Sequence, residues 1–365
     1  MRHEYKPITL VYKNYLTRFN GNTGRFVRTA DIYTGEEAFS ASFPELIDIG
    51  IMETCVCSKR CKVGCYQNAA SRKGSNMSLA NYKRLMDECS GRVMQVALGG
   101  AGDPDTHENF KEILEYSAKS NIVPNFTTSG ICMNDEKAEL CKEYCGAVAV
   151  SEHFADYTDK AVEILLKHKV KTNIHYVLNI DTIDLAIDIL KGKEYRPGIN
   201  AIVFLLYKPV GLGSLDKILK VDNPKVKEFF SLAGNHKCKC KIGFDSCSCS
   251  GLVNFSDKID YTFMDFCEGG RFSMYISSDM KAYPCSFANQ TESGFDISSS
   301  SIDDAWRSFD YFRNRLQRSC LDCKNRQNCM GGCPLLSSIT LCNRKERTIE
   351  RGLIENETEN RLCNK

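Results

Sequence analysis

Six short apolar runs that alternate with amphipathic stretches constrain this chain more than any other feature of its sequence. The runs have the length of β-strands and lie at residues 46–52, 93–98, 122–127, 147–151, 172–178 and 201–207. Between them, apolar residues recur at helical spacing, as in "SLANYKRLMDEC", where Ser78 is placed to cap a helix. This alternation predicts a parallel sheet with crossover helices. Six units are two short of a closed eight-stranded barrel, so a partial barrel or an open sheet is expected.

The pattern changes after Pro209. One further helix is expected at 224–234, and the chain from 235 to 342 is then short-segmented, turn-rich and cysteine-rich. Such composition is typical of a module in which bound metal replaces a large apolar core. We therefore divide the chain into four segments: an N-terminal extension with β-forming pieces (1–45), a partial (β/α)6 barrel (46–234), a cysteine-rich module (235–345) and a charged tail (346–365).

Twenty cysteines among 365 residues are the main anomaly of the composition. The N-terminus has no apolar core of signal-peptide length, and the longest apolar run, 201–206, is far shorter than the roughly 20 residues that span a bilayer. We expect a cytoplasmic protein whose clustered cysteines bind metal or iron–sulfur clusters rather than form disulfides. The formal net charge of +2 gives no attraction for nucleic acid, and no segment is suited to a membrane.

The first cysteine group, "CVCSKRCKVGCY", directly follows the first strand and is therefore expected at the carboxyl edge of the sheet. It contains Cys55, Cys57, Cys61 and Cys65, and Tyr66 comes next. Three thiolates from one loop can hold three irons of a four-iron cluster and leave one iron without a protein ligand. Cys61 and Cys65 suit two of these positions, and either Cys55 or Cys57 suits the third. Four clustered thiols would also suit a tetrahedral zinc ion.

The second strand ends in "LGGAGDP". Gly99 and Gly100 leave backbone groups bare there, so that a ligand can approach closely. Asp103 and His107 follow, and either is a candidate to face a substrate, although helix capping would explain polar residues in this turn equally well.

The C-terminal cysteines carry the most specific spacing. "CLDCKNRQNCMGGC" has the pattern C-x2-C-x5-C-x3-C, formed by Cys320, Cys323, Cys329 and Cys333, and Cys342 follows nine residues later. Upstream, "MYISSDMKAYPC" predicts a hairpin that returns Cys285 toward this group, with Cys267 before it. "HKCKCKIGFDSCSCSG" adds two C-x-C pairs, at 238–240 and 247–249. A zinc ribbon is the alternative explanation of these spacings.

The strand-to-loop pattern, the Cys-Tyr at the end of the loop, the Gly-Gly pair and the C-terminal spacing together resemble radical S-adenosylmethionine enzymes with a C-terminal SPASM domain, over residues 46–342. The family's usual loop is C-x3-C-x2-C, and this loop departs from it by at least one residue. "IDIGIMETC" resembles the family's first strand leading into its first ligand, which favours Cys55, whereas the tighter spacing favours Cys57. A cubane that binds S-adenosylmethionine at its cysteine-free iron is implied.

The resemblance also implies roles for individual residues. Gly99 and Gly100 would contact the amino group of S-adenosylmethionine, and Tyr66 would lie near its adenine. Ribose or carboxylate contacts are implied at three strand ends, Ser151, Glu152 and Asn179. Two auxiliary four-iron clusters, for three [4Fe-4S] clusters in all, are implied in the C-terminal module. The outer cluster would be held by Cys320, Cys323, Cys329 and Cys342, and the inner cluster by Cys267, Cys285 and Cys333 with Cys247 or Cys249.

Members of this family generate a 5′-deoxyadenosyl radical that abstracts hydrogen from a substrate, and most members with a SPASM domain act on peptides. The resemblance therefore implies maturation of a ribosomally synthesised precursor peptide by thioether or carbon–carbon crosslinking, with a reducing partner such as flavodoxin or ferredoxin. Formation of formylglycine in a sulfatase is the alternative activity, and a non-catalytic iron–sulfur electron carrier is the alternative of another class.

Overall fold

The computed structural model describes residues 2–35, 38–57, 64–261, 264–316 and 318–343. Cys61 of the first cysteine group and the predicted tail 346–365 lie outside these residues. Within the described part of the chain, no helix combines the length and apolar character needed to cross a lipid bilayer.

The six predicted strands are six consecutive parallel strands of one sheet. Each pairs with the next along the chain, from β4 to β9. Their bounds are β4 Leu46–Met52, β5 Gln95–Gly100, β6 Val123–Thr128, β7 Val148–Ser151, β8 Thr172–Leu178 and β9 Ala201–Leu206. Because each strand is followed by a helix, the predicted (β/α)6 repeat is confirmed.

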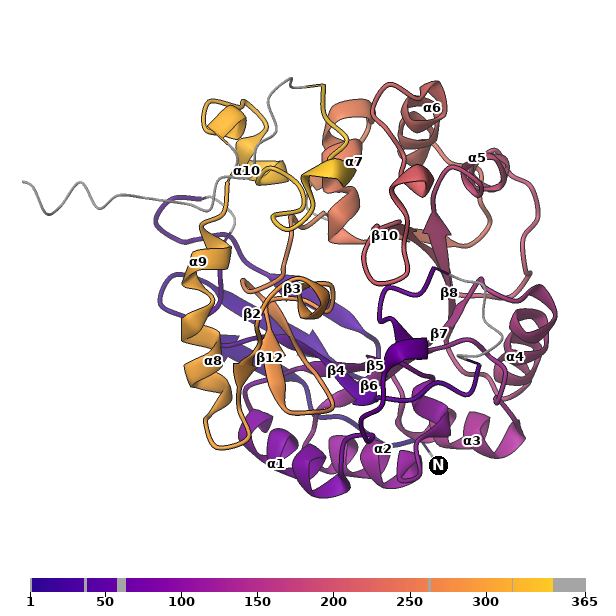
Figure 1. Cartoon of the computed structure of the whole chain (residues 1–365), viewed down its shortest axis with the longest axis vertical. Helices are drawn as coiled ribbons and strands as arrows, with labels where there is room; N and C mark the ends of the chain where they lie inside the picture. The colour runs from indigo at the N-terminus through magenta and orange to yellow at the C-terminus, as the bar shows by residue number, and fades with distance from the viewer. Residues whose placement is uncertain (1, 36–37, 58–63, 262–263, 317, 344–365) are drawn as a thin grey trace, which may run out of the picture.

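The crossover helices cover the outer face of this sheet (Figure 1). They are α1 Leu79–Cys89, α2 Phe110–Lys119, α3 Asp135–Tyr144, α4 Ala155–Lys167, α5 Ile183–Leu190 and α6 Pro224–Ala233. The predicted cap is present, since the Ser78 side chain accepts a hydrogen bond from the Asn81 N–H at 3.2 Å. In α1 the buried residues Tyr82, Leu85, Met86 and Cys89 form one helical stripe against the core.

The inner face of the sheet is concave. Thr127 Oγ1 on β6 lies 3.3 Å from His175 Nδ1 on β8, although β7 lies between these strands. Neighbouring strands are about 4.8 Å apart, so only a curved sheet brings side chains of non-adjacent strands this close. On the other face of β8, Ile174 and Tyr176 are buried in the core. The sheet is therefore a partial barrel, apolar outside and polar inside.

Four strands from beyond residue 234 extend this sheet. β10 Lys241–Phe244 pairs parallel with β9, and β11 Ser273–Ile276 pairs parallel with β4. β12 Lys281–Tyr283 then forms the predicted hairpin with β11, and β13 Phe295–Asp296 pairs with β12. Among the described residues the ten strands run from β10 to β13 as an open sheet. The domain boundary at 234/235 stays a prediction, and the sheet crosses it.

The N-terminal extension forms a small antiparallel sheet of its own, β1 Ile8–Val11, β2 Leu16–Asn20 and β3 Arg25–Arg28. Tyr5 and Phe19 pack against Met94 and Val123 at the amino end of the barrel. Arg28 binds the buried carboxylate of Glu45 at 2.7 Å. The extension is thus attached to the barrel by both apolar packing and an ion pair.

The C-terminal region contains short helices joined by turns. They are α7 Cys249–Phe255, α8 Ile302–Ser308, α9 Asp310–Arg313 and α10 Arg326–Cys329, and the 3-10 turn Ser246–Ser248 leads into α7. The indole N–H of Trp306 donates to the Ala41 carbonyl at 3.0 Å, which joins this region to the end of the extension.

Candidate functional site

The first cysteine loop begins against the glycine-rich end of β5. The Ala101 N–H donates to the Met52 carbonyl at 2.8 Å, and Gly100 has a φ of 120°. A Cβ at Gly100 would lie 2.2 Å from the Met52 carbonyl oxygen, and one at Gly102 would lie 2.0 Å from that of Thr54. A side chain at either position would collide with the backbone of the cysteine loop, so both positions require glycine.

Gly99 differs from its neighbours. A Cβ built there would meet no heavy atom within 4 Å, so the space in front of this residue is open. The strand end therefore combines a backbone locked to the cysteine loop with an unfilled space beside it. That is the local arrangement expected of a site where a ligand approaches the backbone.

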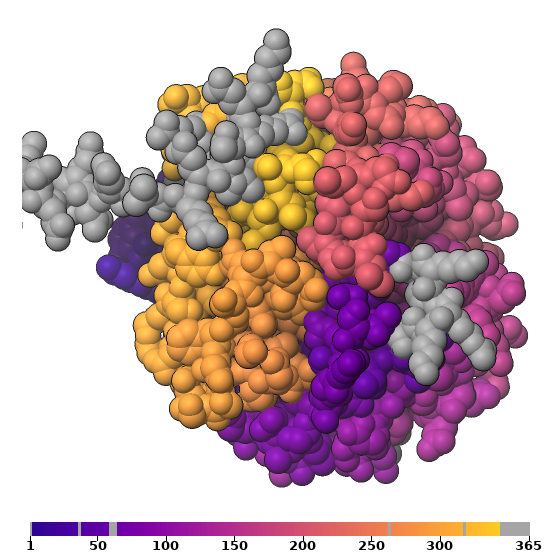
Figure 2. Space-filling model, viewed as in Figure 1, coloured from indigo at the N-terminus to yellow at the C-terminus, as the bar shows by residue number. Residues whose placement is uncertain are grey.

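The end of the loop is held by a second glycine turn. The Leu212 N–H donates to the Cys65 carbonyl at 3.0 Å. Gly211 has a φ of 61°, and a Cβ there would lie 2.4 Å from the Tyr66 carbonyl oxygen. The Tyr66 ring contacts that of Phe287 with centroids 4.6 Å apart. In Figure 2 the purple residues that follow Gly64 lie between the salmon-coloured residues near 215 and the orange C-terminal third.

The inner face of the barrel carries two ionisable groups, Asp48 and His175, that were not predicted as site residues from the sequence. Burial raises the pKa of Asp48 to about 7, and burial lowers the pKa of His175 to about 4. Desolvation disfavours the charged form in both cases. The concave face is thus a polar lining with restricted access to water.

The three predicted contacts at the ends of β7 and β8 have partners inside the protein. Glu152 is bound by Tyr195 and Arg196. Asn179 Oδ1 accepts the backbone N–H groups of the turn that follows it, from Asp181 at 2.8 Å and Thr182 at 3.1 Å. The Ser151 carbonyl accepts the Thr158 hydroxyl at 3.0 Å. Ligand contacts at Ser151, Glu152 and Asn179 stay predictions.

Asp103 and His107 are also engaged within the fold. Asp103 accepts both the backbone N–H and the hydroxyl of Ser129, which joins the ends of β5 and β6. His107 is buried, and its Nδ1 accepts the Asn109 N–H at 3.0 Å, so its Nε2 donates to the Met77 carbonyl at 3.0 Å. Both nitrogens of His107 are therefore occupied by backbone groups, and contact with a substrate stays a prediction.

Four cysteines from separate segments meet beside this edge of the sheet. Cys333 interacts electrostatically with Cys247, Cys267 and Cys285, and most with Cys247. We call these four residues the inner cysteine group. The Ala288 N–H donates to the Cys285 carbonyl at 3.1 Å, which closes a turn directly after this thiol.

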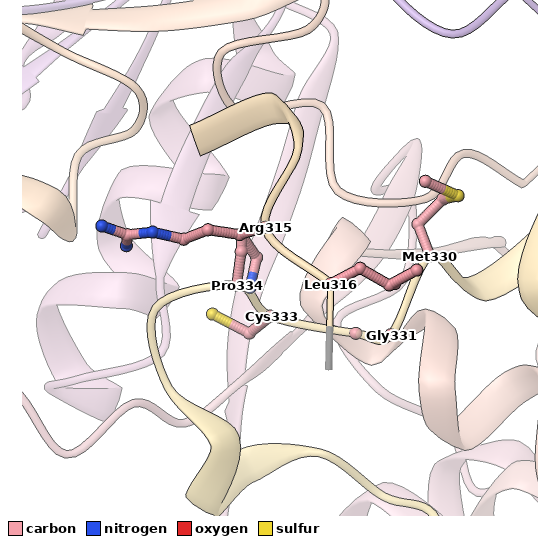
Figure 3. Close-up of a pocket in the computed structure, with 7 residues that line it drawn as sticks. Arg315, Leu316, Met330, Gly331, Cys333 and Pro334 are labelled. Carbon is pink, nitrogen blue, oxygen red and sulfur yellow. The ribbon is translucent and has the colours of Figure 1, made fainter. Parts of the chain in front are cut away.

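The predicted outer set also lies in one place. Cys320 interacts electrostatically with Cys329, Cys323 and Cys342. Gly331 and Gly332 have φ values of 82° and 78°, and the Gly332 N–H donates to the Cys329 carbonyl at 3.0 Å. Cys249 pairs with Cys329 rather than with Cys333. Figure 3 shows the turn from Met330 to Pro334, which places Cys333 beside Arg315 at a small pocket.

The inner group suits a multi-iron cluster. Burial, followed by the charge of Cys247, raises the pKa of Cys267 to about 11, and burial raises that of Cys285 further. Thiolates here need a compensating cation, which ligated iron supplies. Among the described residues, no three His, Cys, Asp or Glu side chains are placed to hold a single metal ion. A cubane takes one thiolate at each iron, so its ligands surround it instead.

Three residues that the sequence patterns did not reveal lie between the first cysteine loop and the inner cysteine group. They are Lys208, Asp245 and Phe287. Lys208 lies two residues after β9, Asp245 directly follows β10, and their largely buried side chains form an ion pair. The Lys208 ammonium lies 4.6 Å from the centroid of Phe287, the ring that contacts Tyr66. The only sequence signal for this pair was a lysine that follows an apolar strand within two residues.

Comparison with known proteins establishes the fold. The sequence matches no protein-family model and none of the curated proteins. Among solved structures, the chain resembles SuiB of Streptococcus suis bound to S-adenosylmethionine, with a TM-score of 0.70 and 14% identity over 92% of this chain and 96% of that one. SuiB bound to its precursor peptide SuiA matches with a TM-score of 0.68 and 13% identity over the same shares.

The protein anSMEcpe, solved with AdoMet and the Kp18Cys peptide, matches with a TM-score of 0.56 and 17% identity over 80% of this chain and 89% of that one. The chain therefore has the fold of these S-adenosylmethionine-bound proteins over nearly its whole length, and the fold class expected from the resemblance is confirmed. Likeness at this level of identity shows the fold alone.

Proposed function

We propose that the chain is a radical S-adenosylmethionine enzyme that modifies a peptide. The observation that carries the proposal is the inner cysteine group: four thiols from separate segments, two buried (Cys267 and Cys333) and two half-buried (Cys247 and Cys285), placed beside the edge of the sheet where the first cysteine loop emerges. A simple electron carrier does not need a barrel with an open, glycine-lined space at that edge. SuiB and anSMEcpe, which share the fold, were solved with S-adenosylmethionine and with peptides, and this supports both ligands here.

In this proposal, Cys61, Cys65 and either Cys55 or Cys57 hold a four-iron cluster. When bound, that cluster supplies the electron that cleaves S-adenosylmethionine to methionine and the 5′-deoxyadenosyl radical. The open space at Gly99 accommodates the amino acid end of S-adenosylmethionine, and Tyr66 lies on the adenine side. The poorly hydrated concave face keeps water from the reacting substrate carbon.

The auxiliary ligands follow the two groups of thiols. We propose Cys247, Cys267, Cys285 and Cys333 for the inner cluster, and Cys320, Cys323, Cys329 and Cys342 for the outer one. Cys247 is preferred to Cys249 because it interacts with all three other members of the inner group. A reducing partner of the flavodoxin or ferredoxin type completes the system.

Iron content tests the number of clusters. After anaerobic reconstitution we expect about twelve iron atoms per chain, four for each of three clusters, and little zinc. Elemental analysis of the purified full-length chain measures both metals. About four irons, or zinc in stoichiometric amount, would contradict the three-cluster proposal.

Binding of S-adenosylmethionine is tested by two neighbouring glycines. Gly99→Val adds a side chain to the open space, so it should leave the melting temperature unchanged and weaken binding by about tenfold or more, which is about 1.4 kcal/mol. Gly102→Ala places a methyl group against the Thr54 carbonyl and should instead destabilise the fold by about 1 to 3 kcal/mol. Equilibrium dialysis and thermal unfolding of both variants separate these effects. Unchanged binding of S-adenosylmethionine by Gly99→Val would show that the ligand does not occupy this space.

The peptide reaction has two candidates. We favour crosslinking of a ribosomally synthesised precursor, by a thioether or a carbon–carbon bond, because the match to SuiB covers more of this chain than the match to anSMEcpe. Formylglycine formation is retained because anSMEcpe with its Kp18Cys peptide shares the fold. Incubation of the reduced enzyme with each peptide type, followed by mass measurement of the product, distinguishes them.

A further inference from the structure

A buried ion pair lies between the first cysteine loop and the inner cysteine group. Lys208, at the carboxyl end of β9, and Asp245, at the carboxyl end of β10, are directly paired through the ammonium and one carboxylate oxygen. Their side chains are only 5% and 16% exposed. Asp245 also accepts the Ser248 hydroxyl at 2.7 Å, which fixes the orientation of its carboxylate.

This pair is not needed to align the two strands. β9 and β10 are already joined over four residue pairs of a parallel ladder, from Lys241 opposite Ala201 to Phe244 opposite Phe204. Burying two charges costs several kcal/mol in desolvation, and an apolar pair of similar volume often stabilises a protein equally well. The charges therefore require an explanation beyond packing.

The ion pair lies beside the segments that carry two members of the inner cysteine group, Cys247 and Cys285. Asp245 is two residues before Cys247, and the Lys208 ammonium lies 4.6 Å from the ring centroid of Phe287, which is two residues after Cys285. Lys208 and Asp245 both interact electrostatically with Cys247, and their charges have opposite signs. One fixed cation and one fixed anion thus act in opposite directions on the same ligand.

We propose that Lys208 and Asp245 set the reduction potential of the iron–sulfur cluster that the inner cysteine group holds. The inference rests on the proposed function, because it requires that cluster. Reduction adds negative charge to a cluster, so a buried cation at its sulfur ligand favours the reduced state, and a buried carboxylate disfavours it. Lys208 raises the potential and Asp245 moderates that effect.

Charge variants test this opposition in the full-length chain. The background is Cys61→Ala/Cys65→Ala, which leaves the two auxiliary clusters and removes the signal of the first. At a fixed potential near the unmodified midpoint, Lys208→Met should lower the ratio of reduced to oxidised inner cluster at least tenfold, or 59 mV for one electron. Asp245→Asn, which keeps the shape of the side chain, should raise that ratio. Lys208→Arg keeps the charge and should change it less than either.

Redox titration followed by electron paramagnetic resonance measures the ratio, and the outer cluster is the internal control because its ligands do not contact the pair. The proposal is supported if the resonance signal of one cluster titrates at a lower potential in Lys208→Met and at a higher potential in Asp245→Asn. Equal iron content with no shift would overturn it and leave the proposed function intact, whereas absence of auxiliary iron in the unmodified background would contradict the proposed function itself. If Lys208→Met loses its iron, Asp245→Asn decides, and an unchanged or lowered ratio there refutes the inference.

Discussion

Replacement of Cys61 and Cys65 together with alanine should abolish cleavage of S-adenosylmethionine and leave about eight iron atoms per chain, those of two four-iron clusters. The reason is that one loop supplies all protein ligands of the proposed first cluster, while the auxiliary ligands come from residues 247 to 342. Loss of two of three thiolates removes that cluster without touching the others. Iron analysis and chromatographic detection of 5′-deoxyadenosine measure the two effects on the same preparation.

Two further sets of variants make this experiment decisive. Single replacements at Cys55 and Cys57 identify the third ligand, because only the true ligand should lower cleavage strongly. The matched control is Cys238→Ala/Cys240→Ala, since these two partly exposed thiols lie 3.2 Å from each other at the opposite, amino end of β10. The control should retain full iron content and cleavage. If neither Cys55 nor Cys57 matters, the ligand assignment in this loop is wrong.

Deletion of residues 1–40 should reduce turnover of the precursor peptide far more than it reduces uncoupled cleavage of S-adenosylmethionine. The small sheet of the extension has β3 at one edge, where an extended peptide could add as a further strand. Apolar side chains are exposed there, including Phe26 at 39% and Val27 at 44%. Product formation and 5′-deoxyadenosine formation, measured on one preparation, separate recognition from radical generation.

The structure shows why the deletion needs a companion variant. Removing Arg28 leaves the carboxylate of Glu45 buried without its partner, and this alone destabilises the barrel. Phe26→Ser/Val27→Ser keeps Arg28 and its ion pair with Glu45, although it removes the ring that lies 5.2 Å from the Arg28 guanidinium, so it should lower peptide turnover without lowering uncoupled cleavage. Tyr157→Ser, equally exposed on the outer helix α4, is the control and should change neither rate. An unchanged peptide rate in Phe26→Ser/Val27→Ser would remove the recognition role from this edge.

Local pattern was sufficient to predict the six central strands. β4 and β8 have the predicted bounds, because each is an apolar or alternating run with the length of one strand. β10 was missed because "KIGF" is short and lies in a cysteine-rich segment without periodicity. The pairing of β11 with β4 joins residues far apart in the chain, and no local signal contains such information.

Some features of the candidate site could likewise be predicted from the sequence, and others could not. Cysteine spacing identified the thiols, but only the tertiary structure separates Cys247, which contacts Cys333, from Cys249, which contacts Cys329. Polar residues at strand ends were predicted as ligand contacts from the family resemblance. The structure shows that Glu152 and Asn179 have internal partners, which depend on Arg196 and on the geometry of a turn. Lys208 and Asp245 were missed because neither belongs to a motif.

The parallel pairing of β11 with β4 has a consequence for biosynthesis. β4 emerges early, but its second neighbour consists of residues 273–276, so this edge of the sheet stays unpaired until the last third of the chain is made. An unpaired strand as apolar as "LIDIGIM" is prone to associate with other chains. A nascent or truncated chain that ends near residue 234 would therefore aggregate rather than fold by itself. For the cluster proposed in the first loop, iron insertion would then follow synthesis of the cysteine-rich region, because that region completes the sheet from which the loop emerges.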